Sequence, residues 1–354
     1  LSFALDEAAR TAALVGIASS ALEGELTIPA EISTSAGTYK VTAVNSSGGG
    51  ATASELAPEN GAAADAADDP ASTPNPYATD LFAAADKAPG ITSIIIPASV
   101  DAIDPAFFQR FPSAAHIAVA AGNSAYLSHN GMLFGANDAG EPADLLLVPE
   151  GMEGAAVLPT SLATVPACVL TRCNKLSAIV FPTGGTADAR FTSLDGILYS
   201  KNLNAEGAPD GTLTLVAAPA GIGSSAKVAP ACTVISEGAF WGNGALRTLV
   251  VSGNVDSIEQ GDPSFSSSRA ERSEAEGSSP QANANTPAFS PEATQDATVQ
   301  TDSREAWEAA GFTHFSQPPL PGAMAGPAWG QSGLSYKLLD DFTLAVRWEG
   351  TDAA

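Results

Sequence analysis

Gly90-Ile91-Thr92-Ser93-Ile94-Ile95-Ile96-Pro97-Ala98-Ser99-Val100-Asp101-Ala102-Ile103-Asp104-Pro105-Ala106-Phe107 contains the pattern that decides the fold of this chain. Its first half reads apolar, any residue, apolar, proline, at Ile94, Ile96 and Pro97. Apolar residues follow three, six and ten positions after the proline, at Val100, Ile103 and Phe107. The alternation predicts a short β-strand with one buried face. Proline cannot donate to a strand ladder, so it predicts where that strand ends.

The same motif recurs along the chain, at residues 26–29, 94–97, 156–159 and 179–182. Pro159 and Pro182 are 23 residues apart, and the step from Ile94 to Ile117 repeats this spacing. A period in the low twenties is typical of leucine-rich repeats, in which each copy supplies one short strand and one return segment. Because one copy cannot bury its apolar face alone, the copies are expected to stack into a solenoid.

The repeat positions are therefore predicted to form the hydrophobic core. They are Ile94, Ile96, Pro97, Val100, Ile103, Phe107, Pro159, Leu162, Ile179, Phe181, Pro182 and Phe240. The strand positions are expected to line one side of the core, and the later positions to fill it from the return segment. The predicted fold class is α/β leaning towards all-β, a short solenoid with inserted hairpins and flanking β modules.

Two related segments interrupt the simple repeat, 65 residues apart. Tyr126-Leu127-Ser128-His129-Asn130-Gly131-Met132-Leu133-Phe134 resembles Phe191-Thr192-Ser193-Leu194-Asp195-Gly196-Ile197-Leu198-Tyr199. Asn-Gly and Asp-Gly between apolar runs indicate a type I′ turn, because both central residues of that turn need positive φ. We therefore expect β-hairpins inserted between the repeats.

Changes in composition divide the chain into six predicted segments. They are an N-terminal β module at 1–44, a disordered insertion at 45–80, the solenoid at 81–261, a disordered linker at 262–301, a helical cap at 302–316, and a Pro-rich linker with the start of a further β module at 317–354. The insertion and the linker contain too few large apolar residues to offset the entropy cost of ordering. The cap is expected to be a two-turn helix that starts at Asp302 or Ser303 and closes the solenoid with Trp307, Phe312 and Phe315.

The two ends of the sequence resemble each other. Leu1-Ser2-Phe3 and Thr11-Ala12-Ala13-Leu14-Val15 match Leu334-Ser335-Tyr336 and Thr343-Leu344-Ala345-Val346, with nearly equal offsets. The last residues are therefore predicted to open a second copy of the N-terminal module, so the sequence looks like a piece of a longer chain. Coincidence is the alternative, since each match is short.

Composition and charge exclude several classes of function. The formal net charge of −24 repels phosphate backbones and anionic lipids, which disfavours nucleic-acid binding and electrostatic membrane docking. No run of 18 apolar residues is present, so direct membrane insertion is not expected. Cys168, Cys173 and Cys232 form no metal-binding spacing. They are interpreted as buried small thiols, with a Cys168–Cys173 disulfide as the alternative.

No motif predicts an enzyme, a metal site or a cofactor. His116, His129 and His314 lie in no HExxH, nucleophile-elbow or triad context. An acidic tract at 65–69 lacks the pattern of a calcium loop and is interpreted as solvated surface. A pocket lined by paired carboxylates or by a Ser/His couple would revive the hypothesis of an enzyme.

The repeat resembles the BspA-like (Treponema-type) leucine-rich repeat of bacterial surface proteins. Residues 90–107 carry the clearest copy, and Val234-Ile235-Ser236-Glu237-Gly238-Ala239-Phe240 is a second fragment. The Asn/Asp-Gly hairpins and the Ala306-Trp307-Glu308-Ala309-Ala310-Gly311-Phe312 segment resemble that family too, so the likeness covers about half of the chain. Gly184-Gly185 departs from the pattern. The resemblance implies an exported cell-surface protein that contacts host cells, matrix proteins or glycans.

Two hypotheses for function follow. The first is a non-enzymatic binding and adhesion module that recognises a host or matrix protein or a glycan, with Phe108 and Trp241 as exposed contact residues. Packing of both aromatics in the core is the alternative, because aromatic side chains are usually at least half buried. The second hypothesis is a structural spacer in a larger surface protein. They differ in whether the strand positions Ile95, Ala118, Val180 and Val250 form an exposed apolar patch.

Overall fold

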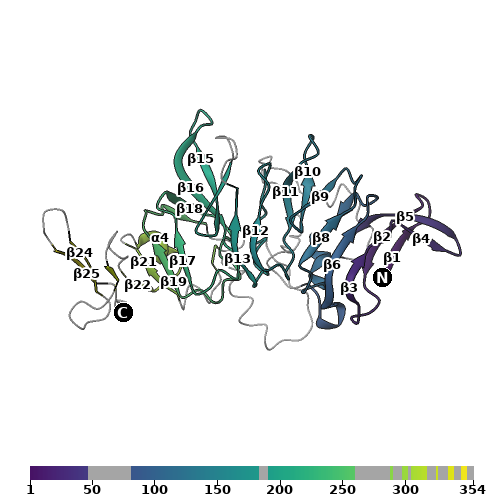
Figure 1. Ribbon diagram of the computed structural model, residues 1–354, viewed down its shortest axis with the longest axis horizontal. Helices are drawn as coiled ribbons and strands as arrows, with labels where there is room; N and C mark the ends of the chain where they lie inside the picture. Colours follow the sequence, from purple (N-terminus) through teal and green to yellow (C-terminus); the bar gives the residue numbers. More distant parts are fainter. Residues whose placement is uncertain are drawn as a thin grey trace.

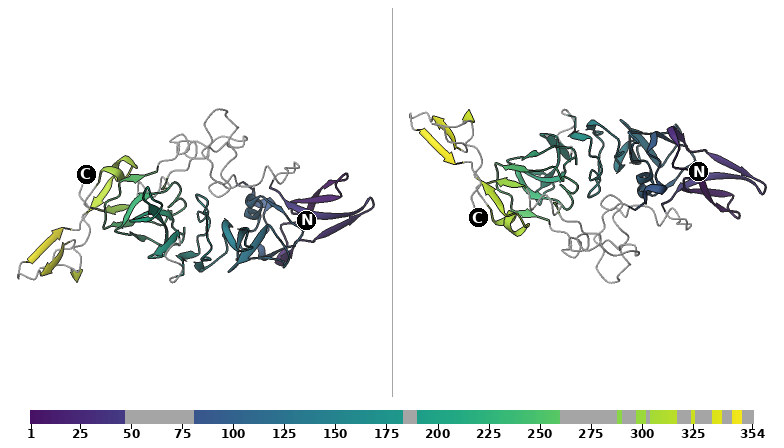
Figure 2. Two further views of the ribbon diagram at one scale, coloured as in Figure 1. Left: turned by 90° about the horizontal axis from the view of Figure 1, so that it is seen from above. Right: turned by 90° about the horizontal axis from the view of Figure 1, so that it is seen from below.

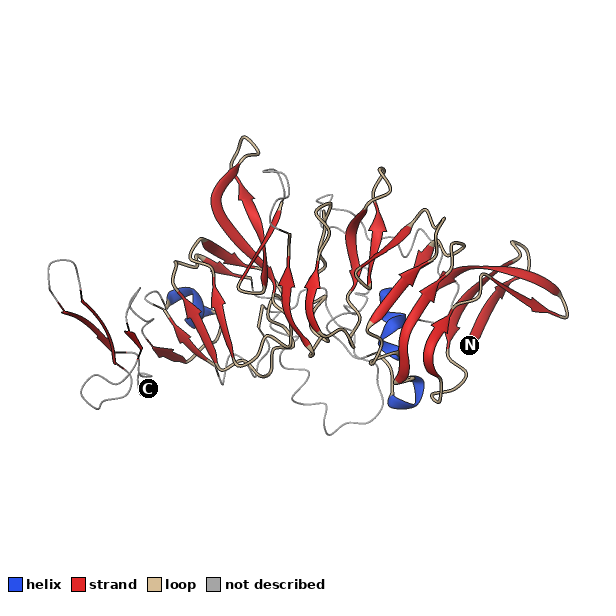
Figure 3. Cartoon of the chain, in the orientation of Figure 1, coloured by secondary structure: helices blue, strands red, loops and turns tan. Residues whose placement is uncertain are grey.

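The chain folds mostly as β-strands with few helices, as Figure 3 shows. The computed structural model describes residues 1–46, 81–182, 190–259, 288–289, 297–301 and 304–316, and the backbone alone at 324–325, 334–338 and 344–348. The predicted insertion at 45–80 lies almost wholly outside these residues, as do most of the 262–301 linker, the Pro-rich segment, the 65–69 tract and Gly184-Gly185. No helix in the described part is long and apolar enough to cross a membrane.

Three short parallel sheets follow one another along the long axis of the molecule (Figure 1). They contain β3 (Glu23–Thr27), β6 (Gly90–Ile96) and β8 (His116–Val119); β12 (Gly154–Val157) and β13 (Leu176–Val180); and β17 (Ser225–Val228), β19 (Thr248–Val251), β21 (Thr298–Gln300) and β22 (His314–Ser316). Each strand carries one copy of the apolar motif or its equivalent. The arrangement is that of a leucine-rich-repeat-like solenoid.

A second set of strands lies on the return side of the repeats. At the N-terminal end, β2 (Thr11–Gly16), β5 (Gly37–Val44) and β7 (Ala102–Ile103) pair in parallel, with β1 (Ser2–Asp6) and β4 (Glu31–Thr34) added antiparallel at the edges. Towards the other end, the parallel strands are β16 (Pro209–Ala217), β18 (Cys232–Ile235) and β20 (Ser257–Ile258). The hydrophobic core lies between the two sets.

Burial along the strands follows the predicted alternation. The repeat positions Ile94, Ile96, Val100, Ile103 and Phe107 are each at most 3% exposed. The later copies behave in the same way at Leu162, Ile179, Phe181 and Phe240, and the prolines Pro97 and Pro159 are buried, while Pro182 is partly exposed. Strand β6 ends at Ile96, directly before Pro97, and strands β12 and β13 end two residues before Pro159 and Pro182. Proline stops each strand because it has no N–H to donate to the ladder.

Both predicted hairpins form, each with the expected turn. The first pairs β9 (Tyr126–His129) with β10 (Met132–Ala136), which continues to β11 (Pro142–Leu147). The second pairs β14 (Phe191–Leu194) with β15 (Ile197–Leu203), which continues to β16. All four central turn residues have positive φ: 50° and 82° at Asn130 and Gly131, and 52° and 80° at Asp195 and Gly196. The type I′ prediction is confirmed.

Each hairpin turn takes the place of a strand in the parallel series. The amide of Ile117 on β8 donates to the Gly131 carbonyl over 2.9 Å, and the amide of Ile179 on β13 donates to the Gly196 carbonyl over 2.8 Å. Two residues further along each strand, another backbone amide donates to a serine hydroxyl of the same hairpin. Val119 donates to Ser128, and Phe181 donates to Ser193. The turns therefore cover the last strand of the first and second sheets.

The predicted disordered linker at 262–301 is wrong at its C-terminal end. Phe289 is 3% exposed and Val299 is fully buried. Val299 lies on β21, which adds a parallel strand between β19 and β22. Composition averaged over the segment hid these few apolar residues, which are stabilised by packing on a core already formed by the repeats.

The predicted helix forms, but it is shorter than expected and is not the end of the solenoid. Helix α4 spans Glu305–Ala309, and its N-cap residue is Arg304, whose side chain makes no capping hydrogen bond. The last strand of the sheet is β22, which contains Phe315. Trp307 and Phe312 pack edge-on with ring centroids 5.6 Å apart, and both rings contact Phe289. This aromatic cluster fills the core beneath the last strands.

The N-terminal module is not separate from the solenoid at residue 44. Strand β3 lies within the predicted module, yet it pairs in parallel with β6 and is the first strand of the solenoid. Sequence composition marks the change after residue 44 but carries no information about pairing between distant strands. The remaining strands of the module are joined to the repeats through the pairing of β5 with β7.

Replacing the turn glycine of the second hairpin tests its contact with the parallel sheet. A Cβ at Gly196 would lie 3.1 Å from the Ala178 Cβ, whereas Gly207, with almost the same φ of 79°, has open space. Both Gly→Ala changes cost about 1–2 kcal/mol through the left-handed backbone. We expect Gly196→Ala to lower the free energy of unfolding, measured by urea denaturation, by about 1 kcal/mol more than Gly207→Ala. Equal losses would contradict the contact.

Replacing Phe289 tests whether this residue belongs to the core. Phe289→Ala is expected to lower the free energy of unfolding by about 3–5 kcal/mol, because it removes a buried ring from the aromatic cluster. Leu203→Ala is the control, since Leu203 is 57% exposed and its loss should change stability by at most about 0.5 kcal/mol. Similar small effects in calorimetry for both variants would restore the linker interpretation of residue 289.

Candidate functional site

The exposed face of the parallel strands carries a row of aliphatic side chains. We call Ile95, Ala118, Val157, Val180 and Val250 the aliphatic row. Ile95 pairs with Ala118 in the first sheet, and Val157 pairs with Val180 in the second. Val250 pairs with Lys227 in the third. Each residue occupies the central outward position of its motif, so side-chain alternation places the row on one face.

Val157 and Val180 are the most exposed members of the row. They are 36% and 39% exposed, whereas the adjacent inward residues Ala156, Leu158 and Ile179 are each 2% exposed. Ile95, Ala118 and Val250 are partly buried. The predicted patch is therefore centred on the second sheet. Val157 was not among the four predicted positions, although the motif at 156–159 already places it between two buried residues.

The two hairpin turns lie on either side of the valine pair. The Asn130 side-chain amide donates to the Val157 carbonyl over 3.0 Å and holds the first turn against β12. The second turn contacts β13 through Gly196, and its Asp195 carboxylate lies 3.9 Å from the Lys227 ammonium group. The arrangement places an aliphatic centre between polar flanks. Leu194, 42% exposed, directly precedes the second turn.

Phe108 and Trp241 are not exposed, so the prediction that these two side chains contact a partner is wrong. Each is 4% exposed. Phe108 lies on the 3₁₀-helix η2 (Pro105–Arg110), and its ring packs edge-on against Phe107 with centroids 6.0 Å apart. Trp241 precedes Gly242, whose backbone packs directly on that of Thr171 in the preceding return segment. Tight stacking of the return segments buries both aromatics of each pair. This agrees with the alternative interpretation, in which Phe108 and Trp241 pack in the core.

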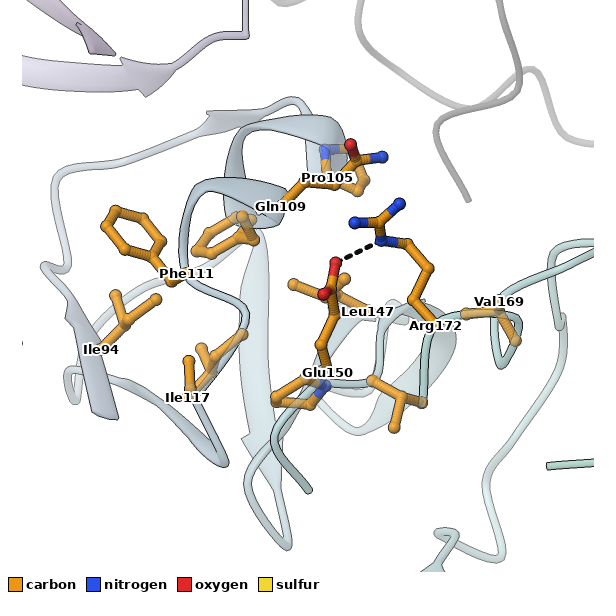
Figure 4. A pocket seen from close by; sticks show the side chains of 13 residues that line it. Ile94, Pro105, Gln109, Phe111, Ile117, Leu147, Glu150, Val169 and Arg172 are labelled. Carbon is orange, nitrogen blue, oxygen red and sulfur yellow. Dashed lines mark hydrogen bonds and ion pairs between the residues drawn. The ribbon is translucent and has the colours of Figure 1, made fainter. Parts of the chain in front are cut away.

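A small cavity lies beneath the first sheet, next to η2 (Figure 4). Ile94, Phe111 and Ile117 line its inner side, and Glu150 and Arg172 point toward each other at its rim and form a hydrogen-bonded ion pair. Its volume of about 20 Å³ is close to that of a single water site. The cavity is a packing gap between repeats and has no room for an organic ligand.

Among the described residues, His116, Ser93 and Glu25 lie near one another but do not form a catalytic triad. His116 lies on the exposed face opposite Ser93, but the Ser93 hydroxyl donates to the Glu25 carboxylate over 3.3 Å. In a catalytic triad the carboxylate orients the histidine. Here the Glu25 carboxylate instead accepts a hydrogen bond from the Ser93 hydroxyl. Burial lowers the pKa of His129, whose ring packs edge-on against Phe134, which favours the neutral form.

The remaining candidates for metal or nucleophile chemistry are equally unfavourable. His314 is exposed on β22. Within the described part of the chain, no group of three or more His, Cys, Asp or Glu side chains could hold a metal ion. Cys168, Cys173 and Cys232 are buried thiols, and no disulfide joins Cys168 to Cys173. Burial raises the pKa of Cys173 to about 12 and that of Cys232 to about 11, which keeps both thiols protonated and unreactive.

Two asparagines that sequence inspection did not single out have structural roles. The Asn123 side-chain amide donates to the carbonyls of Pro97 and Val100, over 3.2 and 2.7 Å. The Asn243 amide donates to the Pro219 carbonyl over 2.6 Å. Each satisfies carbonyl groups of the preceding return segment. They link successive repeats even though the asparagine ladder of ordinary leucine-rich repeats is absent from the sequence pattern.

Comparison with known proteins finds distant similarity to bacterial leucine-rich-repeat proteins. No protein-family model matches the chain, and no curated protein matches it. The pneumococcal vaccine antigen PcpA is similar with a TM-score of 0.32 and 15% identity, over 69% of this chain and 58% of the antigen. A leucine-rich repeat protein from Eubacterium ventriosum has a TM-score of 0.28 and 18% identity, over 48% and 38% of the two chains.

A leucine-rich cell surface protein from Faecalibacterium prausnitzii is also similar, with a TM-score of 0.23 and 16% identity, over 70% of this chain and 68% of that protein. The chain thus spans 58% of the pneumococcal antigen and 38% of the Eubacterium protein. The repeat architecture of this chain rests on its own strand pairing.

Proposed function

We propose that this chain is a non-enzymatic recognition module of a bacterial cell-surface protein, which binds a protein or glycan of host cells or matrix. The observation that carries the proposal is the exposed valine pair on β12 and β13. Val157 and Val180 stand side by side on neighbouring strands, more than one third exposed, on a face whose inward neighbours are fully packed.

The geometry of this patch suits a contact site. A small aliphatic centre between polar flanks resembles the arrangement of binding hot spots, in which a desolvated core is surrounded by groups that keep hydrogen-bonding partners. Here Asn130 lies on one flank and the Asp195–Lys227 pair on the other. A partner that buries one aliphatic group or a sugar ring face over the valines leaves these polar groups in contact with water.

The family resemblance implies a location at the cell surface, and the charge limits the class of partner. A net charge of −24 keeps the chain soluble and disfavours nucleic acids and anionic lipids as partners. The buried thiols of Cys173 and Cys232 stay protonated, so they are unsuited to covalent chemistry. We therefore assign the exposed face to recognition. Cell-surface leucine-rich-repeat proteins of bacteria are among the structures to which the chain is similar.

The experiment is a binding screen of the whole chain against purified matrix proteins and immobilised glycans. Val157→Asp and Val180→Asp are each expected to weaken binding by at least about tenfold, because they place a charge in the apolar centre. Leu203→Asp is the matched control, since Leu203 is exposed on the β15–β16 hairpin, away from the row. Biolayer interferometry gives the affinities, and circular dichroism checks that all variants are folded.

Two outcomes contradict the proposal. If the folded chain binds none of the proteins or glycans, a structural spacer becomes the better function, a role that the sequence match between the two ends of the chain favours. If a ligand binds equally well to both valine variants and to the control, the chain is a recognition module but the valine pair is not its contact site.

A further inference from the structure

A polar junction joins the first hairpin turn to the second parallel sheet. The Asn130 side-chain nitrogen lies 3.0 Å from the Val157 carbonyl oxygen on β12 and 3.1 Å from Nε2 of the neighbouring His129. The Gly131 carbonyl of the same turn accepts the Ile117 amide on β8, so the turn bridges the first and second sheets. Figure 2 shows, from above and from below, that this part of the chain lies between the blue N-terminal strands and the green strands further along.

Both side-chain hydrogen bonds of the junction come from one amide nitrogen. An amide NH₂ group only donates, so Nε2 of His129 accepts, and the neutral imidazole carries its proton on Nδ1. Protonation places a hydrogen on Nε2, where it faces the amide hydrogens and removes the acceptor. Rotation of the Asn130 amide would turn its oxygen to the protonated ring, but it would also place that oxygen against the Val157 carbonyl. Protonation therefore costs the bond to Val157 in either case.

The surroundings of His129 favour its neutral form. The ring packs edge-on against Phe134, which is fully buried, with ring centroids 6.2 Å apart. Burial lowers the pKa of His129 below its ordinary value of 6.5. A histidine whose pKa is lowered by folding stabilises the folded contact above its ordinary pKa, and this stabilisation is lost as the pH falls toward the folded value.

The neighbouring strands bring two other titratable groups towards β9. Strand β8 supplies His116, whose ring lies against the turn, since a Cβ at Gly131 would be 3.0 Å from its Cδ2. Strand β11 supplies Asp144, whose carboxylate accepts the Thr164 hydroxyl over 2.6 Å. Strands β10 and β12 contain no charged residue. His116 is therefore the group whose titration has to be separated from that of His129.

We propose that His129 is a pH-sensitive latch: its neutral ring holds the Asn130 side chain on the Val157 carbonyl, and its protonation releases the first hairpin turn from β12. Val157 is one half of the valine pair, so the latch controls one polar flank of the recognition face, a consequence that rests on the proposed function.

The second hairpin turn lacks this device. Leu194 stands where the first hairpin has His129, and Asp195 replaces Asn130. The Asp195 carboxylate lies 3.9 Å from the Lys227 ammonium group. Protonation of a histidine can therefore act on the first flank of the valine pair and not on the second.

The test is a pH titration of the whole chain by NMR from about pH 8 to about pH 5, which ends above the ordinary pKa of carboxyl groups. Labelling valine carbonyl carbons with ¹³C and leucine amides with ¹⁵N selects Val-Leu pairs. The sequence contains two, Val157-Leu158 and Val169-Leu170. The Val157 carbonyl resonance is expected to shift with the midpoint of the His129 ring, below pH 6.5, and the Val169 carbonyl serves as the internal reference.

Three variants separate the latch from other causes. His129→Gln keeps a side-chain acceptor that does not titrate, so the Val157 shift should be lost. Asn130→Gly suits the positive φ of the turn but removes the amide, so the His129 ring still titrates while the Val157 carbonyl no longer follows it. His116→Gln is the matched control and should leave the Val157 shift unchanged. Slow amide exchange of Ile117 in every variant shows that the turn remains on β8.

Three results overturn the latch. They are a Val157 carbonyl resonance that does not move with the His129 midpoint, a movement that persists in His129→Gln or Asn130→Gly, and a movement that is lost in His116→Gln. The titration needs no ligand, so failure of the latch and failure of the valine variants in the binding screen are distinguishable.

Discussion

The hydrogen bonds from Ile117 and Ile179 to the turn carbonyls of Gly131 and Gly196 hold the solenoid together across its two interruptions. A parallel strand at the end of a sheet exposes backbone groups that need partners. Here a type I′ turn supplies them, because its left-handed backbone presents the glycine carbonyl to the strand. The three parallel sheets can then follow one another while long hairpins project between them (Figure 1).

This constraint also shapes the exposed face. Each turn supplies one polar residue to the face, Asn130 before the second sheet and Asp195 after it. Asn130 bonds to the backbone of Val157, whereas Asp195 lies near the side chain of Lys227, the residue at the equivalent position of the next sheet. The valine pair is thus flanked by two turns of the same geometry and different chemistry. An apolar contact centre with asymmetric polar flanks follows from the way the hairpins are inserted.

The short-range features were predictable because they depend on neighbouring residues. Alternation and a terminal proline defined the strands, and Asn-Gly and Asp-Gly defined the turns, as their positive φ values confirm. Features that depend on distant contacts were not predictable in this way. Composition assigns Phe289 and Val299 to a linker although both are buried, and the pattern leaves open whether Phe108 and Trp241 are exposed or packed, which the stacked return segments decide in favour of packing. Local composition does not report what packs on a residue from elsewhere in the chain.

The sequence by itself determined the repeating strand, its buried and exposed faces and the turn type of each hairpin, because backbone geometry imposes a period of two on a strand and positive φ on a type I′ turn. Only the tertiary structure decided which strands are neighbours. It joined β3 to β6, placed β21 between β19 and β22, and set each hairpin turn beside a parallel strand. The exposed valine pair is a product of that pairing. Strand pairing is a choice among many backbone edges with the same hydrogen-bonding groups, and only the packing of the complete core selects among them.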